Sequence, residues 1–175
     1  MKIISQEEIT VLGDRAAELF KQGFNCSQAV FAACAPTLYG MDENLALRVA
    51  ASFGGGIGRM RGVCGVASGM FLLAGMENGS ATPGDSDGKM RNYALVQRLA
   101  TAYKQEYGSL FCSELLGLTP KPGELTMTPR HEVAADFHSP KPGERTDEYF
   151  KKRPCVEMIR EAVAMYVKTV KENNL

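Results

Sequence analysis

The chain has 175 residues, a length that corresponds to a single domain. Hydrophobic residues make up 45% of the chain and charged residues 23%, which excludes a disordered composition. The 20 Lys and Arg residues are balanced by 20 Asp and Glu. The chain therefore lacks the basic surplus of a general nucleic-acid binder, and we expect no nucleic-acid partner.

No stretch of the sequence has the length and composition of a targeting or membrane-spanning segment. The N-terminus turns acidic at Glu7, before an apolar signal region develops. The longest uncharged, mostly apolar stretch runs from Gly62 to Met76, which is shorter than the roughly 20 residues that a spanning helix needs. We expect a cytoplasmic protein without membrane insertion, in which this stretch is a core helix.

Helix signals begin close to the N-terminus. Ser5 and Glu8 form a capping-box pattern in front of a helix predicted over residues 6–22. Asn25 is a suitable N-cap for a second helix, which begins at Cys26 and ends before the glycine at position 40. The predicted helices are amphipathic or apolar and follow one another closely.

The middle of the chain continues this helical pattern. Asp42 caps a third helix that runs to about Phe53, and a glycine-rich link follows at 54–58. A helix from about Gly62 to Gly75 has no polar face, which predicts a central position. A loop from Gly79 to Gly88 then leads into a long helix that ends near residue 107.

The last third of the chain is less regular. Ser109 is a candidate N-cap for a short helix through Cys112. Residues 118–150 are Pro-rich and contain Pro-Lys-Pro-Gly-Glu twice, which predicts an irregular surface excursion that could cover a site as a lid. Pro154 suits the first turn of a final helix to about Lys171. The expected fold is all-α: one domain over residues 1–175, a compact bundle of about six helices around the central apolar helix.

The chemistry of the chain is concentrated in its cysteines, of which there are five. Four of them lie at or near predicted helix starts, where unsatisfied N–H groups and the helix dipole favour the thiolate. These four are Cys26, Cys64, Cys112 and Cys155. Cys34 lies in the middle of a helix, which predicts a packing role. No Cys-x-x-Cys pair occurs, so neither a thioredoxin motif nor a zinc ribbon is indicated.

The segments around these cysteines resemble one family. They read Asn-Cys26-Ser-Gln-Ala-Val, Phe53-Gly-Gly-Gly-Ile-Gly-Arg-Met60, Cys64-Gly-Val-Ala-Ser-Gly69, Tyr107-Gly-Ser-Leu-Phe-Cys112-Ser-Glu-Leu-Leu-Gly117, and Cys155. In this order they resemble the C-GCAxxG-C-C proteins, a family described as redox-active with four characteristic cysteines. One departure is Val66, where the family signature has Ala. The resemblance implies that the same four cysteines form the site and leaves Cys34 outside it.

Three functions remain compatible with this cysteine pattern. The first is a thiol-based redox protein, such as a thiol–disulfide oxidoreductase, in which one thiolate attacks an oxidised small molecule or a redox partner and a second cysteine resolves the intermediate. The second is a cofactor-binding protein in which Cys26, Cys64, Cys112 and Cys155 hold an iron–sulfur cluster or zinc. The third is a helical interaction module with inert cysteines.

Two further groups of residues are candidates for binding. Gly58, Arg59 and Arg61 precede a predicted helix start, where an anion could bind. Alternatively, the two arginines are solvated, or they lower the pKa of Cys64. Because these arginines are nearby in the sequence, Cys64 is the predicted attacking thiol. His131 and His138, the two histidines, are too far apart on one helix to share a metal easily, and they are predicted to lie in a surface loop.

Overall fold

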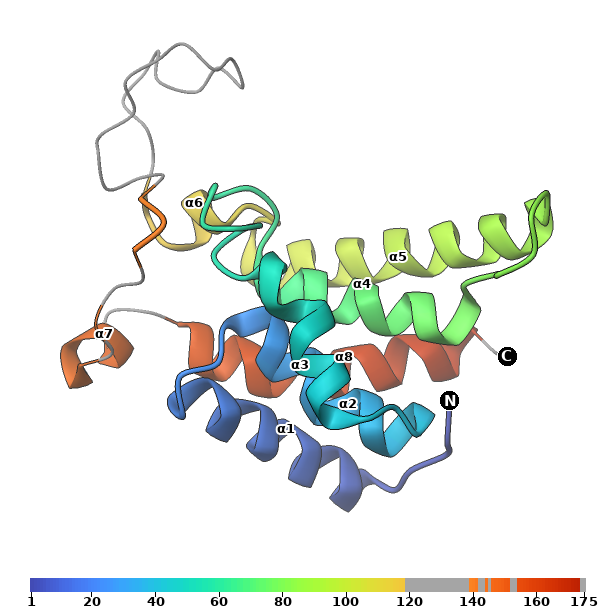
Figure 1. Ribbon diagram of the computed structural model, residues 1–175, viewed down its shortest axis with the longest axis horizontal. Helices are drawn as coiled ribbons and strands as arrows, with labels where there is room; N and C mark the ends of the chain where they lie inside the picture. Colours follow the sequence, from blue (N-terminus) through green and yellow to red (C-terminus); the bar gives the residue numbers. More distant parts are fainter. Residues whose placement is uncertain (119–138, 142–143, 145, 152–153, 174–175) are drawn as a thin grey trace, which may run out of the picture.

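The computed structural model describes residues 1–118, 139–141, 144, 146–151 and 154–173. Within these residues the secondary structure is helical (Figure 1). Its elements are α1 (Gln6–Lys21), α2 (Cys26–Tyr39), α3 (Glu43–Ala50), the 3₁₀ helix η1 (Ala51–Phe53), α4 (Gly65–Asn78), α5 (Ser86–Tyr107), α6 (Cys112–Leu115), α7 (Asp147–Lys151) and α8 (Cys155–Asn173). The predicted all-α class is confirmed, and the six helices of eight residues or more form the bundle.

Two helices, rather than the single one expected, occupy the centre of the bundle. α4 packs against α2, α5 and α8, and α2 packs against α1, α3, α4 and α8. Both helices bury side chains on nearly all sides; in α2 the run from Ala29 to Ala35 is completely buried. α2 and α4 pack closely because Gly69 faces Val30, where a Cβ on the glycine would lie 2.8 Å from the valine Cβ. The small residues of α4 therefore serve this close helix packing.

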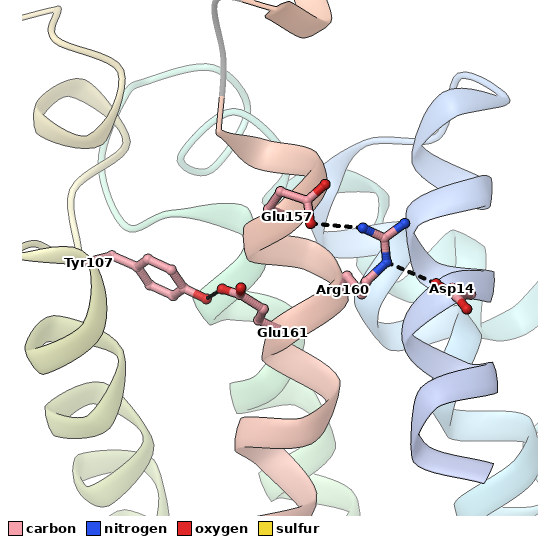
Figure 2. Close-up of polar contacts among 5 residues, drawn as sticks. All are labelled: Asp14, Tyr107, Glu157, Arg160 and Glu161. Carbon is pink, nitrogen blue, oxygen red and sulfur yellow. Dashed lines mark hydrogen bonds and ion pairs between the residues drawn. The ribbon is translucent and has the colours of Figure 1, made fainter. Parts of the chain in front are cut away.

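α1 and α8 lie side by side across the bundle (Figure 1). The capping box of Ser5 and Glu8 starts α1 as predicted, with Glu8 N–H donating to Ser5 Oγ at 3.1 Å. Arg160 on α8 donates to Asp14 on α1 at 2.8 Å and also to Glu157 one turn earlier on its own helix (Figure 2). On the other side, Tyr107 at the end of α5 donates to Glu161 of α8 at 2.7 Å (Figure 2). These contacts hold α8 between α1 and α5.

Buried hydroxyl groups join the central helices near the C-terminal end of α2. Tyr166 on α8 donates to the carbonyl oxygen of Leu73 on α4 at 3.0 Å, and its hydroxyl also contacts that of Tyr39 on α2. Tyr39 in turn donates to Glu77 on α4 at 2.9 Å. This network secures the end of α2 opposite Cys26, so the position of α2 within the bundle is fixed.

Three predicted boundaries were wrong by a few residues. The central helix begins at Gly65 rather than near Gly62, because residues 54–64 form an irregular loop. α5 begins at Ser86, inside the predicted loop, since Asp85 accepts from Gly88 N–H and caps it. α6 begins at Cys112 and not after Ser109, because Leu110 lies in a bend and Phe111 is extended and pairs with Val63.

Most of the predicted excursion, including His131 and His138, lies outside the described residues. The described part of 118–150 contains the short helix α7, where the sequence predicted irregular structure. In the part of the chain that the structure describes, no helix is long and apolar enough to cross a membrane.

Candidate functional site

Three of the four helix-start cysteines line one pocket of about 290 Å³. Cys26, Cys112 and Cys155 are the first residues of α2, α6 and α8, so the starts of three helices meet there. The described lining residues are Phe20, Asn25, Cys26, Ala51, Gly54, Gly55, Gly58, Arg59, Arg61, Cys112, Leu116, Pro140, Tyr149 and Cys155. Cys26 and Cys155 are half-buried and Cys112 is buried, and all five cysteines of the chain are thiols.

The start of α2 is held from two directions. Asn25 and Gln28 form a capping box in which each side chain accepts from the backbone N–H of the other residue at 3.0 Å. The Asn25 amide also donates to the carbonyl oxygen of Ala51 at 2.8 Å, and the Gln28 amide donates to that of Leu47 at 3.0 Å. Cys26, which lies between these two residues, is thereby fixed relative to α3 and η1.

The wall of the pocket between η1 and α4 is a left-handed loop. All residues from 55 to 59 have positive φ, and so does Arg61. Ile57 (φ 60°), Arg59 (φ 64°) and Arg61 (φ 61°) are the non-glycine members. A β-branched residue with this φ is an outlier, and such residues cost about 1–3 kcal/mol each and cluster at functional sites. The sequence predicted only a glycine-rich link over residues 54–58.

A short antiparallel bridge brings the segments of Cys64 and Cys112 together. Val63 and Phe111 pair across it. The Cys64 N–H donates to the carbonyl oxygen of Leu110 at 2.7 Å, and the Cys112 N–H donates to that of Gly62 at 2.8 Å. Residues far apart in the sequence are thus joined directly at the two cysteines.

Glycines allow the side chains of Cys26 and Cys112 to lie against the neighbouring backbone. A Cβ on Gly65, the residue after Cys64, would lie 2.4 Å from Cys26 Sγ. A Cβ on Gly56 would lie 2.7 Å from Cys112 Cβ. Cys26 therefore lies directly against the backbone that carries Cys64.

Cys64 itself is behind the pocket and not in its lining. It is the N-cap residue of α4 and is 6% exposed. The pKa of Cys64 is raised to about 12, first by burial and then by negative charge on Cys26 and Cys112. The sequence-based expectation of a lowered pKa was wrong, because the desolvation of a buried thiol outweighs the helix start.

Cys64 has a buried hydrogen-bond partner that no sequence pattern indicated. Tyr103 on α5 is completely buried, and its hydroxyl donates to Cys64 Sγ at 3.2 Å. Its ring packs edge-on against Tyr107 at 4.7 Å between centroids, and Tyr107 bonds Glu161 at the surface of α8 (Figure 2). The available signal was the hydroxyl itself: a tyrosine within an apolar helical stripe needs a buried partner.

We expect Tyr103→Phe to raise the pKa of Cys64 above that of the unmodified chain. The hydroxyl stabilises the thiolate, so its loss favours the protonated thiol. In reduced protein, the ultraviolet absorbance of the thiolate at alkaline pH would follow the titration, with Cys64→Ala in each background identifying its contribution. Tyr107→Phe, which leaves the 3.2 Å bond of Tyr103 intact, is the matched control. If the pKa of Cys64 is the same with and without the Tyr103 hydroxyl, that hydroxyl does not stabilise the Cys64 thiolate.

Of the predicted anion-binding residues, all three line the pocket. Gly58, Arg59 and Arg61 belong to the left-handed loop, and Arg61 is 7% exposed. Arg59 Nε donates to the carbonyl oxygen of Ser139 at 2.7 Å, so a described part of the excursion contacts this loop. Two arginines of this loop therefore line the same pocket as the three cysteines.

Cys34 is outside this site, within the core. It is completely buried in α2, and burial alone raises its pKa to about 12. Eight positions separate it from Cys26, a rise of about 12 Å along the helix. Among the residues that the structure describes, no group of three or more His, Cys, Asp or Glu side chains is arranged to hold a metal ion. The described thiols therefore share a pocket without forming a ready ligand set.

Comparison with known proteins identifies the family. A family model described as "Putative redox-active protein (C_GCAxxG_C_C)" matches residues 24–169, which include Cys26, Cys64, Cys112 and Cys155. Searches of curated proteins and of solved structures returned no significant match. Since the match spans most of the 175 residues and all four of these cysteines, the chain belongs to the C_GCAxxG_C_C family.

Proposed function

We propose that this protein exchanges thiols and disulfides, with Cys26 as the attacking thiol and Cys64 as the resolving thiol. The observation that carries the proposal is the position of Cys26. Its sulfur lines the pocket and lies against Gly65, next in the chain to Cys64. We further infer a cytoplasmic setting, because thiols are kept reduced there.

Several features favour Cys26 over Cys64 for the first step. The attacking thiol must be accessible, and Cys26 is half-buried at a pocket whereas Cys64 is 6% exposed. Cys26 also begins a long helix, where the dipole stabilises negative charge. Cys155 shares these features, but Cys155 is not among the groups that raise the pKa of Cys64, whereas Cys26 is.

The electrostatics of the pair favour an ordered sequence. A thiolate at Cys26 raises the pKa of Cys64, so the resolving thiol stays protonated before the reaction. When Cys26 forms a mixed disulfide it loses its charge, and this obstacle to ionising Cys64 disappears. The Tyr103 hydroxyl then stabilises the thiolate that forms.

The atoms and electrons balance as in ordinary exchange. The Cys26 thiolate attacks one sulfur of a substrate disulfide; an S–S bond forms, the substrate S–S bond breaks, and one substrate thiolate leaves. Cys64 then gives its proton to the first substrate thiolate, directly or through solvent, and its thiolate attacks Cys26 Sγ. The Cys26–substrate S–S bond breaks, and the second substrate thiolate leaves and takes a proton from solvent. Two protein thiols are oxidised to one disulfide, and the substrate is reduced to two thiols. A dithiol reductant restores the protein by the reverse reaction.

The excursion fits the role of a lid over this site. Support comes from its described residues: Ser139 accepts from Arg59, and Pro140 and Tyr149 line the pocket. In this proposal, residues 118–150 close over the bound substrate and limit access of water to the mixed disulfide.

The test is single-turnover oxidation followed by peptide mapping. Protein purified without oxygen, reduced and treated with one equivalent of bis(2-hydroxyethyl) disulfide should form one intramolecular disulfide, between Cys26 and Cys64. Cys34 should remain a thiol, because it is completely buried in the core. Metal analysis of the same preparation checks the alternative: about one zinc, or two or four irons with matching sulfide, per chain would contradict the exchange reaction. A different cysteine pair would overturn the assignment of roles.

A further inference from the structure

We propose that the substrate is a small disulfide that carries carboxylate groups. This inference rests on the proposed exchange reaction and adds the chemical class of its substrate. The observation that carries it is the lining of the pocket. Two arginines and three cysteines line it, and no Asp or Glu is among its described lining residues.

The positive charge of the pocket has four sources. Arg59 and Arg61 contribute guanidinium groups, and the starts of α2 and α8 contribute the positive ends of two long helices. The acidic residues of α7, Asp147 and Glu148, are exposed and do not line the pocket. A negative ligand is therefore attracted to the thiols, and a positive ligand is repelled.

The arginines are positioned to recognise a carboxylate. Arg61 is almost completely buried at 7% exposure, and Arg59 is held by the carbonyl oxygen of Ser139. A guanidinium has five N–H donors in a planar fork, so it can keep a protein partner and still donate to a bound carboxylate. The buried position also weakens the screening of its charge by water at short range.

The size and the remaining walls of the pocket favour a small molecule. The volume of about 290 Å³ lies at the lower end of the range for ligand sites. Phe20, Leu116 and Tyr149 provide apolar contacts for the methylene groups and sulfur atoms of the ligand. Tyr149 and Phe20 each pack edge-on against Phe150, so this side of the pocket is supported.

The experiment compares three small disulfides that differ in charge. The probes are 3,3′-dithiodipropionate (two negative charges), bis(2-hydroxyethyl) disulfide (neutral) and cystamine (two positive charges). Reduced, metal-free protein is mixed with each probe without oxygen, and the rate of protein oxidation is measured by acid quench and mass spectrometry. The same series with urea-unfolded protein provides the intrinsic reactivity of the thiols. A solvent-exposed thiolate is negative, so it attracts the cationic probe and repels the anionic one. It therefore reacts faster with cystamine.

We expect the folded protein to reverse that order, with dithiodipropionate at least about tenfold faster than cystamine, as is typical of charge steering into a cleft. Raising the salt concentration should reduce the preference. Arg59→Gln should reduce it as well, and Arg59→Lys should retain part of it. Arg91→Gln is the matched control, because Arg91 is exposed near the start of α5 and does not line the pocket.

The outcomes separate this inference from the exchange reaction itself. If all three probes oxidise the folded protein in the order seen for unfolded protein, the exchange reaction stands and the anionic substrate class is wrong. If none of them oxidises it, the exchange reaction is wrong and the inference fails with it. If Arg59→Gln does not fold, the salt series on the unmodified chain still decides the substrate class, because a preference that salt does not reduce would contradict attraction by charge.

Discussion

Cys64→Ser should trap the protein in a mixed disulfide with its substrate. The attacking thiol remains in this variant, so reaction with bis(2-hydroxyethyl) disulfide should add one mercaptoethanol unit to Cys26. Because the intramolecular thiol is missing, the adduct should persist on the order of 100 times longer than in the unmodified chain. Intact-mass measurements over time would follow the adduct, and peptide mapping would locate it.

Cys26→Ser should remove the attacking thiol, so the variant should accumulate no mixed disulfide with the substrate. Without an accessible thiol beside Gly65, no adduct should accumulate at Cys64, which is buried behind the pocket. The initial rate of oxidation should fall by about 100-fold, because burial leaves Cys64 protonated at neutral pH.

Cys34→Ala provides the matched control for both variants. Cys34 is completely buried in the core and distant from the pocket, so its replacement should lower stability without changing either rate. An adduct on Cys112 or Cys155 in the Cys64→Ser chain would show that the attacking thiol is another lining residue. Rapid loss of the adduct in that chain would show that Cys64 does not resolve it.

The sequence was sufficient to predict the helices that carry these thiols. Capping residues are short-range signals, and those at Ser5, Asn25 and Asp42 start α1, α2 and α3 as predicted. The common setting of the cysteines could also be recognised, since Cys26 and Cys155 each begin a long helix. Local hydrogen bonding and apolar periodicity decide such features, and both are visible in a single sequence.

The environment of Cys64 could not be predicted in the same way. Its helix-start position and the arginines before it suggested a reactive thiolate, but its burial comes from α5 and from the bridge to Phe111. These are contacts between residues far apart in the sequence. The pKa of a thiol depends on desolvation by all its neighbours, so a local pattern gives the wrong sign when tertiary packing covers the sulfur.

The loop at 54–64 is a second feature that local sequence preference does not predict. Its glycines indicated freedom of the backbone, whereas Ile57 and Arg59 share the left-handed conformation of those glycines. Non-glycine residues adopt it rarely, so propensity disfavours the observed structure. The loop is held by local backbone hydrogen bonds, such as that of Gly58 N–H to the carbonyl oxygen of Ser52 at 2.7 Å, and by long-range ones, including that of Arg59 to Ser139. Here tertiary contacts overrule local preference, as is common at functional sites.

Gly65→Ala should destabilise the protein, although helix propensity alone predicts the reverse. Alanine is favoured over glycine in a helix by about 1 kcal/mol. At Gly65, however, the added Cβ would lie 2.4 Å from Cys26 Sγ and 3.0 Å from the carbonyl oxygen of Phe53. Overpacking of this kind costs about 1–3 kcal/mol, so the free energy of unfolding should fall. Urea denaturation followed by circular dichroism would measure the change.

Gly75→Ala, in the same helix, is the matched control. Apart from the neighbouring residues and backbone of its own helix, no atom lies within 4 Å of the position that its Cβ would occupy. This substitution should therefore raise the free energy of unfolding by up to about 1 kcal/mol. The two alanine substitutions in α4 should thus have opposite signs. A Gly65→Ala chain as stable as the Gly75→Ala chain would contradict the close contact between Cys26 and the start of α4.

A double-mutant cycle connects this packing to the proposed thiol pair. In a Cys26→Ala background the sulfur is absent, so Gly65→Ala should cost less than it does in the unmodified chain. The contacts of the new Cβ with Phe53 O and with Ser27 N at 3.2 Å would remain, so part of the cost should persist. A coupling energy of about 0.5–3 kcal/mol is typical of residues in direct contact. Strict additivity would mean that Cys26 Sγ does not lie against Gly65, and the pairing of Cys26 with Cys64 would lose its structural basis.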